Sequence, residues 1–573
     1  MSARLDNVTF PPWIKSYPSF VDWETEIPAE PVHAAFLYSV EAYRNRPCME
    51  FLGNHWTYAE TASLVFKAAK GFQELGLGKG DKIALILPNT PYYIVCYYAA
   101  LMIGSTVVNI NPLYVQREIK DLIIDSEAKA LVTMDLELTY AKTRPLLDET
   151  DLKILIVCPM GQVLPLATSI LFRIFRRRTI ADITDDPRQV WFKELTDNAG
   201  DYLYVKIEPE TDVAVFQYTG GTTGALKAAM LTHSNIAANT FQIFSWDRDP
   251  DLGREKILAA LPFFHVFSMT AVMNLAIKCG GEIILLPRFE LKDCLNTIHK
   301  KKPTYFPAVP TIFSAINNCP DIDKYDLSSI KLCISGGAPL PVEVKTDFER
   351  ITNCVVIEGY GLSETSPVVT TNPTEGDNKA GSVGIPMPAT WIEIRDAEDP
   401  DRILPIGEKG EVYVRGPQVM KGYWKKPEQT TELLRDGLFR TGDLGYIDED
   451  GYLFLIDRLK DIIIAGGYNI YPRIVEEAIQ EHPAVEEVTV IGIDDPYLGQ
   501  VPKAYIKTVA NETLTLEAIE KFLGDKLSPI ERPRSFEFRN ELPKTLIGKL
   551  SKKHLREEES ARASNKKDNR NAE

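Results

Sequence analysis

Short apolar runs alternate with amphipathic stretches through the first two thirds of the chain. The runs are rich in Val, Ile and Leu and end at glycine, proline or charged residues, which is typical of strands buried on both faces of a sheet. They lie at residues 82–88, 129–134, 153–159, 214–219, 282–287, 331–337 and 354–361. Because helical stretches separate these strands, the pattern predicts an α/β domain with mixed, largely parallel sheets flanked by helices.

The pattern changes in the last third of the chain. Residues 410–417 and 451–458 carry charged turns between short strands, which predicts a β-rich subdomain with antiparallel pairing. After it we expect a small α+β domain with helices at 473–482 and 515–527 and strands at 485–493 and 501–508. The polar tail, 557–573, is expected to be disordered.

Two apolar segments raise the question of membrane contact. Residues 92–110 are long enough to suggest a span, but Gly104 and Asn109 interrupt them, so we expect a buried helix followed by a buried strand. Residues 163–181 combine an apolar stretch with arginines at 173, 176, 177 and 178. Such a segment can lie on an anionic membrane surface, or it can be a surface helix packed on its own protein, and the sequence leaves both open.

Composition narrows the class of protein. The 573 residues are 45% hydrophobic and 25% charged, which are ordinary globular values. A net charge of −16 argues against nucleic-acid binding, which needs a basic face. The eight cysteines form no Cys-x-x-Cys pair, so they indicate neither a zinc motif nor a disulfide framework. The first residues contain no apolar stretch of signal-peptide length, and we expect a cytoplasmic protein.

One loop has the composition of a polyphosphate cradle. It follows the strand at 214–219 and consists of Thr219, Gly220, Gly221, Thr222, Thr223, Gly224, Ala225, Leu226 and Lys227. Its glycines let backbone amides approach an anion, its threonines donate hydrogen bonds and its lysine adds a positive charge. The Gly-Lys-Ser/Thr sequence of the P-loop is absent. A tight connection without a ligand is the alternative.

Four later loops also contain residues that a purely structural role does not explain. Their residues are Gly336, Gly337, Ala338, Tyr360, Gly361, Glu364, Asp443 and Lys549. Glycines at a strand's carboxyl end allow a flat ring to approach the backbone, and the tyrosine can stack on it. Glu364 suits a hard cation such as Mg²⁺, and Asp443 suits the diol of a ribose. A lone lysine such as Lys549 would otherwise be an inert surface residue.

A charged pentapeptide, residues 457–461, separates two apolar stretches. A charged connector between buried segments must remain solvated, so it can serve as a pivot, although a charged hairpin turn is the alternative. We therefore expect a domain boundary at this connector, between an N-terminal domain at 1–456 and a small C-terminal domain at 462–556, and the sequence leaves open whether residues 457–461 act as a hinge.

Eight motifs occur along the chain in a fixed order. They are YTGGTTGALKAAMLTH (218–233), LPFFH (261–265), GGAPL (336–340), EGYGLSET (358–365), RTGD (440–443), DRLKD (457–461), AGGYNIYP (465–472) and PKTLIGK (543–549). Their order resembles the core motifs of the adenylate-forming superfamily of acyl-CoA synthetases, firefly luciferases and adenylation domains. Residues 108–119, 163–181 and 416–424 are most similar to the bacterial long-chain fatty-acid CoA ligases. Ala228 departs from that branch, which usually has glycine there, and we expect it to adopt a helical φ.

The resemblance implies ATP-dependent ligation of a fatty acid to CoA through an acyl-adenylate, with release of AMP and pyrophosphate. ATP, Mg²⁺ and CoA would be required. The implied contacts are the 219–227 loop with the β- and γ-phosphates, Glu364 and Thr222 with Mg²⁺, Lys549 with the α-phosphate and carboxylate, Asp443 and Arg458 with the ribose, and Tyr360, Gly361 and residues 336–338 with the adenine.

The resemblance also implies two conformations. After adenylation the small domain would rotate about a hinge within 457–461, at Lys460. The rotation would move Lys549 out of the active site and move the segment that holds Gly466 and Gly467 toward it. His265 is implied at the acyl entrance as a gate or carboxylate-orienting group. A core histidine among aromatic residues is the alternative for His265.

Several alternatives stay open at this point. The chain could be a medium-chain or aryl acid CoA ligase, or an acyl-carrier-protein ligase of the same superfamily. A binding protein without turnover is disfavoured, because such a protein has no need of Lys549. The expected partners are small-molecule substrates and no nucleic acid. A homodimer and a peripheral contact with the inner face of the membrane are also open.

Overall fold

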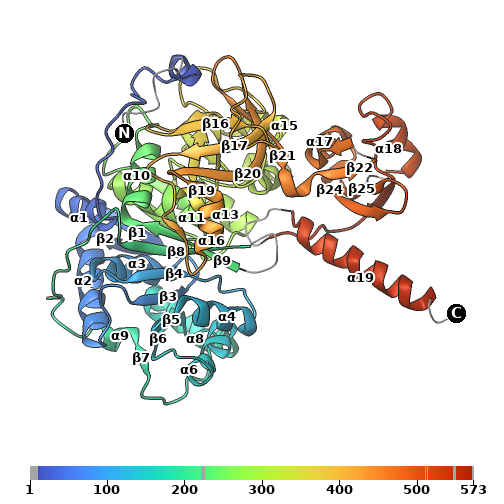
Figure 1. The fold of residues 1–573 in the computed structure, drawn as a ribbon. Helices are drawn as coiled ribbons and strands as arrows, with labels where there is room; N and C mark the ends of the chain where they lie inside the picture. Colours follow the sequence, from blue (N-terminus) through green and yellow to red (C-terminus); the bar gives the residue numbers. More distant parts are fainter. Residues whose placement is uncertain are drawn as a thin grey trace. The chain divides into compact units, whose positions relative to one another are not determined.

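The computed structural model describes residues 11–220, 226–466, 468–509, 512, 514–545 and 550–570. The chain divides into two compact units. Figure 1 labels their helices and strands. Unit 1 comprises Met1–Ile392, Val414–Phe439 and Asp450–Tyr452, and unit 2 comprises Glu393–Tyr413, Arg440–Glu449 and Leu453–Glu573. Residues 393–413 and 440–449 therefore group with the C-terminal part, whereas the sequence motifs place them in the N-terminal domain. The hinge itself stays a prediction.

The central sheet of unit 1 has eight strands in the order β18-β9-β8-β4-β3-β5-β6-β7. Their bounds are β3 Lys82–Ile86, β4 Thr106–Asn109, β5 Ala130–Met134, β6 Ile154–Cys158, β7 Gln189–Trp191, β8 Val213–Gly220, β9 Leu226–Thr232 and β18 Gly422–Tyr423. From β8 to β7 every neighbouring pair is parallel, whereas β9 and β18 run antiparallel. The expected buried, largely parallel sheet is confirmed.

Two smaller sheets complete unit 1, in the orders β10-β11-β1-β2 and β12-β13-β14-β15. Their bounds are β1 Pro47–Phe51, β2 Asn54–Thr57, β10 Lys256–Ala259, β11 Glu282–Leu285, β12 Leu332–Ser335, β13 Val355–Gly361, β14 Val368–Thr371 and β15 Ile385–Pro386. Tyr305 forms bridges to both Ile257 and Leu332, so it joins the two sheets edge to edge.

Helices flank these sheets, as the alternating pattern predicts. In unit 1 they are α1 His33–Ala42, α2 Tyr58–Glu74, α3 Pro91–Met102, α4 Gln116–Ser126, α5 Glu137–Thr143, α6 Leu146–Glu149, α7 Met160–Val163, α8 Leu166–Phe175, α9 Phe192–Leu195, α10 His233–Phe244, α11 Val266–Ser268, α12 Leu275–Lys278, α13 Leu291–Lys301, α14 Pro310–Asn317, α15 Val342–Thr352 and α16 Pro427–Leu433. Every residue of α3 is buried, and β4 follows it, as expected for residues 92–110.

Short helices of other types join these elements. The 3₁₀ helices are η1 Pro12–Ser16, η2 Arg177–Thr179, η4 Ile322–Lys324, η5 Ser363–Thr365 and η6 Leu459–Asp461, and η3 Met269–Asn274 is a π-helix. A capping box of Thr232 and Asn235 starts α10 directly after β9. The first amides of the helix need acceptors, and the cap supplies them. It therefore fixes the end of β9, the strand that follows the glycine-rich loop.

A further sheet has the order β16-β17-β20-β19, with β21 beside β20, and the last sheet has the order β23-β22-β25-β24, with β26 beside β25. The bounds are β16 Trp391–Arg395, β17 Gly410–Arg415, β19 Leu434–Arg435, β20 Leu438–Ile447, β21 Leu453–Arg458, β22 Ile463–Ala465, β23 Tyr468–Ile470, β24 Val485–Asp495, β25 Gly499–Thr508 and β26 Ser535–Phe538. Helices α17 Pro472–Gln480 and α18 Leu516–Leu523 pack their apolar faces on the last sheet, and α19 spans Lys552–Arg570. The expected α+β order is confirmed.

The structure differs from the sequence analysis at Ala228. This residue lies in β9 opposite Tyr218 and is buried in the core, so its backbone is extended rather than helical. Helix α19 runs as far as Arg570, and an ion pair of 2.9 Å joins its Glu559 to Lys503 of β25. The disorder expected for residues 557–573 stays a prediction.

Candidate functional site

The glycine-rich loop is the connection of the β8–β9 hairpin. Thr219 pairs with Lys227, and Gly220 pairs with Leu226, so the hairpin places the first threonine and the lysine opposite each other. Both side chains are half-buried. The other members expected to bind phosphate (Gly221, Thr222, Thr223 and Gly224) lie outside the described residues. The hairpin thus delivers a cation and a hydroxyl to the same end of the central sheet.

Glu364 lies beside this hairpin, in η5, which contacts both β8 and β9. The Tyr423 hydroxyl donates a hydrogen bond of 2.7 Å to Oε1 of Glu364. The Lys227 ammonium lies 5.5 Å from the centre of the Tyr423 ring, within cation–π range. Burial, reinforced by the Glu364 carboxylate, raises the pKa of Tyr423 far above its ordinary value, so this hydroxyl stays protonated and donates. Lys227, Tyr423 and Glu364 therefore form one cluster (the carboxylate cluster).

The carboxylate cluster suits a magnesium ion that arrives on a nucleotide. Mg²⁺ is commonly held by one or two protein carboxylates plus substrate phosphates and water. Tyr423 occupies Oε1 of Glu364, and among the described residues Oε2 has no hydrogen-bond partner. No group of three or more acidic, cysteine or histidine side chains suited to a metal occurs in the described part of the chain. The donor set thus fits a substrate-borne ion better than a resident one.

The segment expected to contact adenine follows β12. Gly337 has a φ of +81°, and a Cβ on Gly336 would lie 3.2 Å from the Phe267 ring. The backbone at Gly336 and the aromatic residue of α11 therefore approach so closely that a larger side chain would have to displace the ring. The buried Glu358 accepts a hydrogen bond of 3.0 Å from the Leu340 amide. That bond fixes the far end of the segment that also holds Ala338.

Tyr360 and Gly361 end β13, whose parallel partner is β12. Tyr360 is half-buried. A Cβ on Gly361 would lie 1.9 Å from the Pro367 carbonyl oxygen, so only glycine fits at this position. The two segments expected to enclose a ring thus leave neighbouring strands at the same edge, which is where open α/β sheets bind ligands.

His265 precedes α11 and is half-buried. Its Nδ1 accepts the Phe267 amide at 3.3 Å and so caps the helix. This contact fixes the orientation of the ring and ties it to the same Phe267 that covers Gly336. The structure therefore links the residue expected at the acyl entrance with the segment expected to contact adenine.

Within unit 2 the structure joins two predicted site residues, Asp443 and Arg458. They lie opposite each other on β20 and β21, with 3.0 Å between Arg458 Nε and Asp443 Oδ1. The turn before Asp443 is held by the buried Glu411, which accepts from Arg440 Nε at 2.7 Å and from the Gly442 amide at 3.2 Å. Burial nevertheless raises the pKa of Glu411.

The proposed hinge lies in β21 and η6. Lys460 is exposed in η6, and its neighbour Asp461 forms an ion pair of 2.8 Å with Arg556 of α19. Gly466 has a φ of +57° and donates its amide to the Leu498 carbonyl at 2.7 Å. Gly467 and Lys549 lie outside the described residues, so their expected roles stay predictions.

Tyr423 and Glu358 are functional candidates that the sequence analysis missed. Tyr423 lies in residues 416–424, a segment that the sequence links to a family but to no function. Its hydrogen-bond partner Glu364 is 59 positions away in the sequence. No local pattern connects the two. Glu358 had a detectable signal, because it is a carboxylate directly after the apolar residues Val355–Ile357 of β13.

Comparisons with known proteins agree with these motifs. Residues 36–424 match the model of the AMP-binding enzyme family, and residues 474–549 match that of the AMP-binding enzyme C-terminal domain. A long-chain-fatty-acid–CoA ligase of Bacillus subtilis is 42% identical over 96% of this chain and 98% of its own. A probable 4-coumarate–CoA ligase of Dictyostelium discoideum is 32% identical over 94% and 96%. The crystal structure of ATP-bound MatB from Rhodopseudomonas palustris superposes with a TM-score of 0.80 at 27% identity, covering 92% of this chain and 99% of that one.

Proposed function

The chain belongs to the family of AMP-binding enzymes, and from this premise we propose that it is a long-chain fatty acid–CoA ligase. It would join a fatty acid to CoA at the expense of ATP and release AMP and pyrophosphate. The observation that carries the proposal is the 42% identity to a long-chain-fatty-acid–CoA ligase over 96% of the chain. That match extends over both AMP-binding family regions and nearly all of the rest of the chain.

In the first half-reaction, a carboxylate oxygen of the fatty acid attacks the α-phosphorus of ATP. The bond from that phosphorus to the bridging oxygen breaks, and pyrophosphate leaves. Both reactants are anions, so the main catalytic task is charge neutralisation and positioning. Lys227 and the 219–227 loop would hold the β- and γ-phosphates, and Lys549 would lie between the α-phosphate and the carboxylate.

Magnesium would offset charge on the phosphate oxygens when it is bound. Glu364 would be its protein ligand, together with Thr222. Tyr423 supports this assignment, because a hydrogen bond to Oε1 fixes the carboxylate while Oε2 stays available. Asp443, oriented by Arg458, would accept hydrogen bonds from the ribose hydroxyls.

Tyr360, Gly361 and the backbone of Gly336, Gly337 and Ala338 would enclose the adenine. His265 would orient the fatty carboxylate. In the second half-reaction the CoA thiolate attacks the acyl carbonyl and AMP leaves. We propose that the small domain turns about residues 457–461, at Lys460, so that Lys549 withdraws and the segment with Gly466 and Gly467 replaces it.

Acyl-CoA formation measured across C6 to C20 acids tests the proposal, with CoA and acyl-carrier protein offered as alternative acceptors. Highest kcat/KM for long chains with CoA is the expected result. A preference for aromatic acids would favour the second candidate, an aryl acid CoA ligase, which the similarity to the Dictyostelium relative supports. A cytoplasmic location belongs to the same proposal.

A further inference from the structure

Helix α8 (Leu166–Phe175) turns its apolar side away from the protein. The exposed fractions are 80% for Leu166, 52% for Ile170, 53% for Leu171, 64% for Ile174 and 78% for Phe175. At about 100° per residue these five side chains cover about half of the helix circumference. The opposite side faces the protein, where the buried Ser169 donates a hydrogen bond of 2.7 Å to the Gly161 carbonyl.

This arrangement reverses the usual one for a surface helix. A helix that packs on its own protein buries its apolar side and exposes its polar side. Contiguous exposed apolar side chains, in contrast to scattered ones, mark surfaces that contact a partner or a membrane. The alternative raised by the sequence, in which the apolar side of residues 163–181 packs on the protein, does not hold for the residues of α8.

The α8 segment is anchored at both ends on one residue, Asp135. Its side-chain Oδ1 accepts the Met160 amide at 2.8 Å, and its carbonyl accepts the Ala181 amide at 2.9 Å. Val163 and Leu164 are buried just before the helix. The apolar side of α8 is therefore held outward by fixed ends rather than left on a loose loop.

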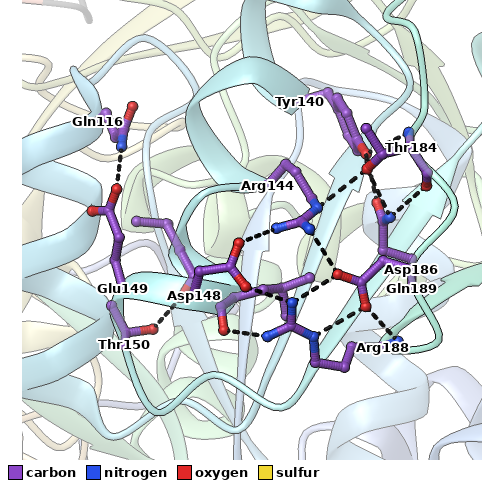
Figure 2. A network of polar contacts seen from close by, with 12 residues as sticks. Gln116, Tyr140, Arg144, Asp148, Glu149, Thr150, Thr184, Asp186, Arg188 and Gln189 are labelled. Carbon is purple, nitrogen blue, oxygen red and sulfur yellow. Dashed lines mark hydrogen bonds and ion pairs between the residues drawn. The ribbon is translucent and has the colours of Figure 1, made fainter.

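A second anchor lies just beyond the segment (Figure 2). Asp186 accepts from Arg144 and from Arg188 at 2.7 Å each. Arg188 also donates to Asp148 at 2.6 Å. This shared network ties the chain after α8 to the α5–α6 region and so fixes the position at which the segment ends.

A cationic cluster continues the helix. Arg176, Arg177 and Arg178 are all exposed, and in the described part of the chain no carboxylate forms an ion pair with them. No acidic residue occurs between 163 and 181, although the whole chain carries a net charge of −16. The positive charge is thus concentrated beside the exposed apolar side chains, with Asp182 as the next acidic residue along the chain.

We propose that α8 and Arg176–Arg178 form a docking surface for an anionic lipid bilayer. The helix would lie in the plane of the interface, with its apolar side among the acyl chains and the arginines on the headgroup phosphates. No helix among the described residues is long and apolar enough to cross a membrane. A second copy of the chain is a poorer occupant, because a twofold contact through α8 would bring two arginine clusters together.

Sedimentation with vesicles tests the docking surface. Vesicles of equal parts phosphatidylcholine and phosphatidylglycerol should bind the full-length protein, and pure phosphatidylcholine vesicles should bind it far less. Binding should weaken as salt rises. Replacing the three arginines (R176Q, R177Q and R178Q together) should weaken binding about a hundredfold, at about fivefold for each charge.

A second variant tests the apolar part, and a matched control tests specificity. Ile174→Gln with Phe175→Gln should reduce binding at least about tenfold. Leu203→Gln with Tyr204→Gln removes a similarly exposed apolar pair, 71% and 80% exposed, at a site outside the segment, and should leave binding unchanged. All variants should retain the parent's rate of ATP–pyrophosphate exchange without vesicles, because none changes a residue of the proposed site.

Two results would overturn the docking surface. One is equal vesicle binding by the parent, the arginine variant and the Ile174–Phe175 variant. The other is light scattering that shows a dimer of the parent which the α8 substitutions dissociate, with no vesicle binding by any form. Neither result bears on ligase activity, so this inference and the proposed function fail independently.

Discussion

Replacing Tyr423 by phenylalanine removes one atom from the carboxylate cluster. The hydroxyl donates to Glu364 Oε1 at 2.7 Å, while the ring that faces Lys227 is kept. Tyr423 is 6% exposed, so water does not readily take the place of the lost oxygen. The substitution therefore tests whether Tyr423 positions Glu364 without disturbing the phosphate-binding lysine.

The expected loss follows from the kind of hydrogen bond. A neutral donor bound to a charged acceptor contributes about 1.5–3 kcal/mol. Glu364 is half-buried, so solvent compensates in part, and we take the lower value. About 1.5 kcal/mol corresponds to about a tenfold decrease in kcat/KM for adenylation.

The assay is ATP–pyrophosphate exchange with palmitate over a range of Mg²⁺ concentrations. Tyr423→Phe should lower the exchange rate and raise the Mg²⁺ concentration needed for half-maximal rate. Tyr92→Phe is the matched control, because Tyr92 is similarly buried, at 3% exposed, and its hydroxyl donates a hydrogen bond of 2.8 Å to the Pro159 carbonyl. It should lower the free energy of unfolding without changing the Mg²⁺ dependence.

A double-mutant cycle with Glu364→Gln separates positioning from general destabilisation. If Tyr423 acts through Glu364, Tyr423→Phe should add little to the loss already caused by Glu364→Gln. An unchanged Mg²⁺ dependence, or an equal further loss in the Glu364→Gln background, would refute the reasoning.

Three other predictions follow from the site and the core. Asp443→Asn should raise the KM for ATP about tenfold or more, because a neutral amide is a weaker acceptor than a carboxylate for the ribose hydroxyls and is no longer held by the charge of Arg458; an unchanged KM in steady-state kinetics would refute the ribose contact. Lys549→Ala should abolish pyrophosphate exchange but leave thioester formation from supplied acyl-adenylate largely intact, and equal loss of both half-reactions would contradict the two conformations. Burial lowers the pKa of His33 to about 4 and that of His233 to about 3, so the unfolded chain binds more protons below about pH 6.5. The free energy of unfolding should therefore decrease as the pH is lowered from about 6.5 to about 4, by at most about 1.4 kcal/mol per histidine per pH unit. In urea titrations His33→Gln should reduce this slope.

Much of the fold could be predicted because the hydrophobic pattern is local and strong. The buried helix and strand in 92–110 are an example, since an all-apolar run interrupted by Gly104 admits few other arrangements. Ala228 was the opposite case. Its neighbours in the sequence indicated a helical backbone, but pairing with Tyr218 across the β8–β9 hairpin fixes it as extended.

The sequence by itself determined the chemistry: which loops carry glycines, hydroxyls, carboxylates and lysines, and in what order. That order sufficed to identify the family, because motifs are short runs whose composition is readable without coordinates. The tertiary structure alone decided how residues distant in sequence meet, such as Tyr423 with Glu364 and Asp443 with Arg458. It also decided which side of α8 faces outward, because periodicity defines the apolar side of a helix, whereas packing of the surrounding chain decides whether that side is buried.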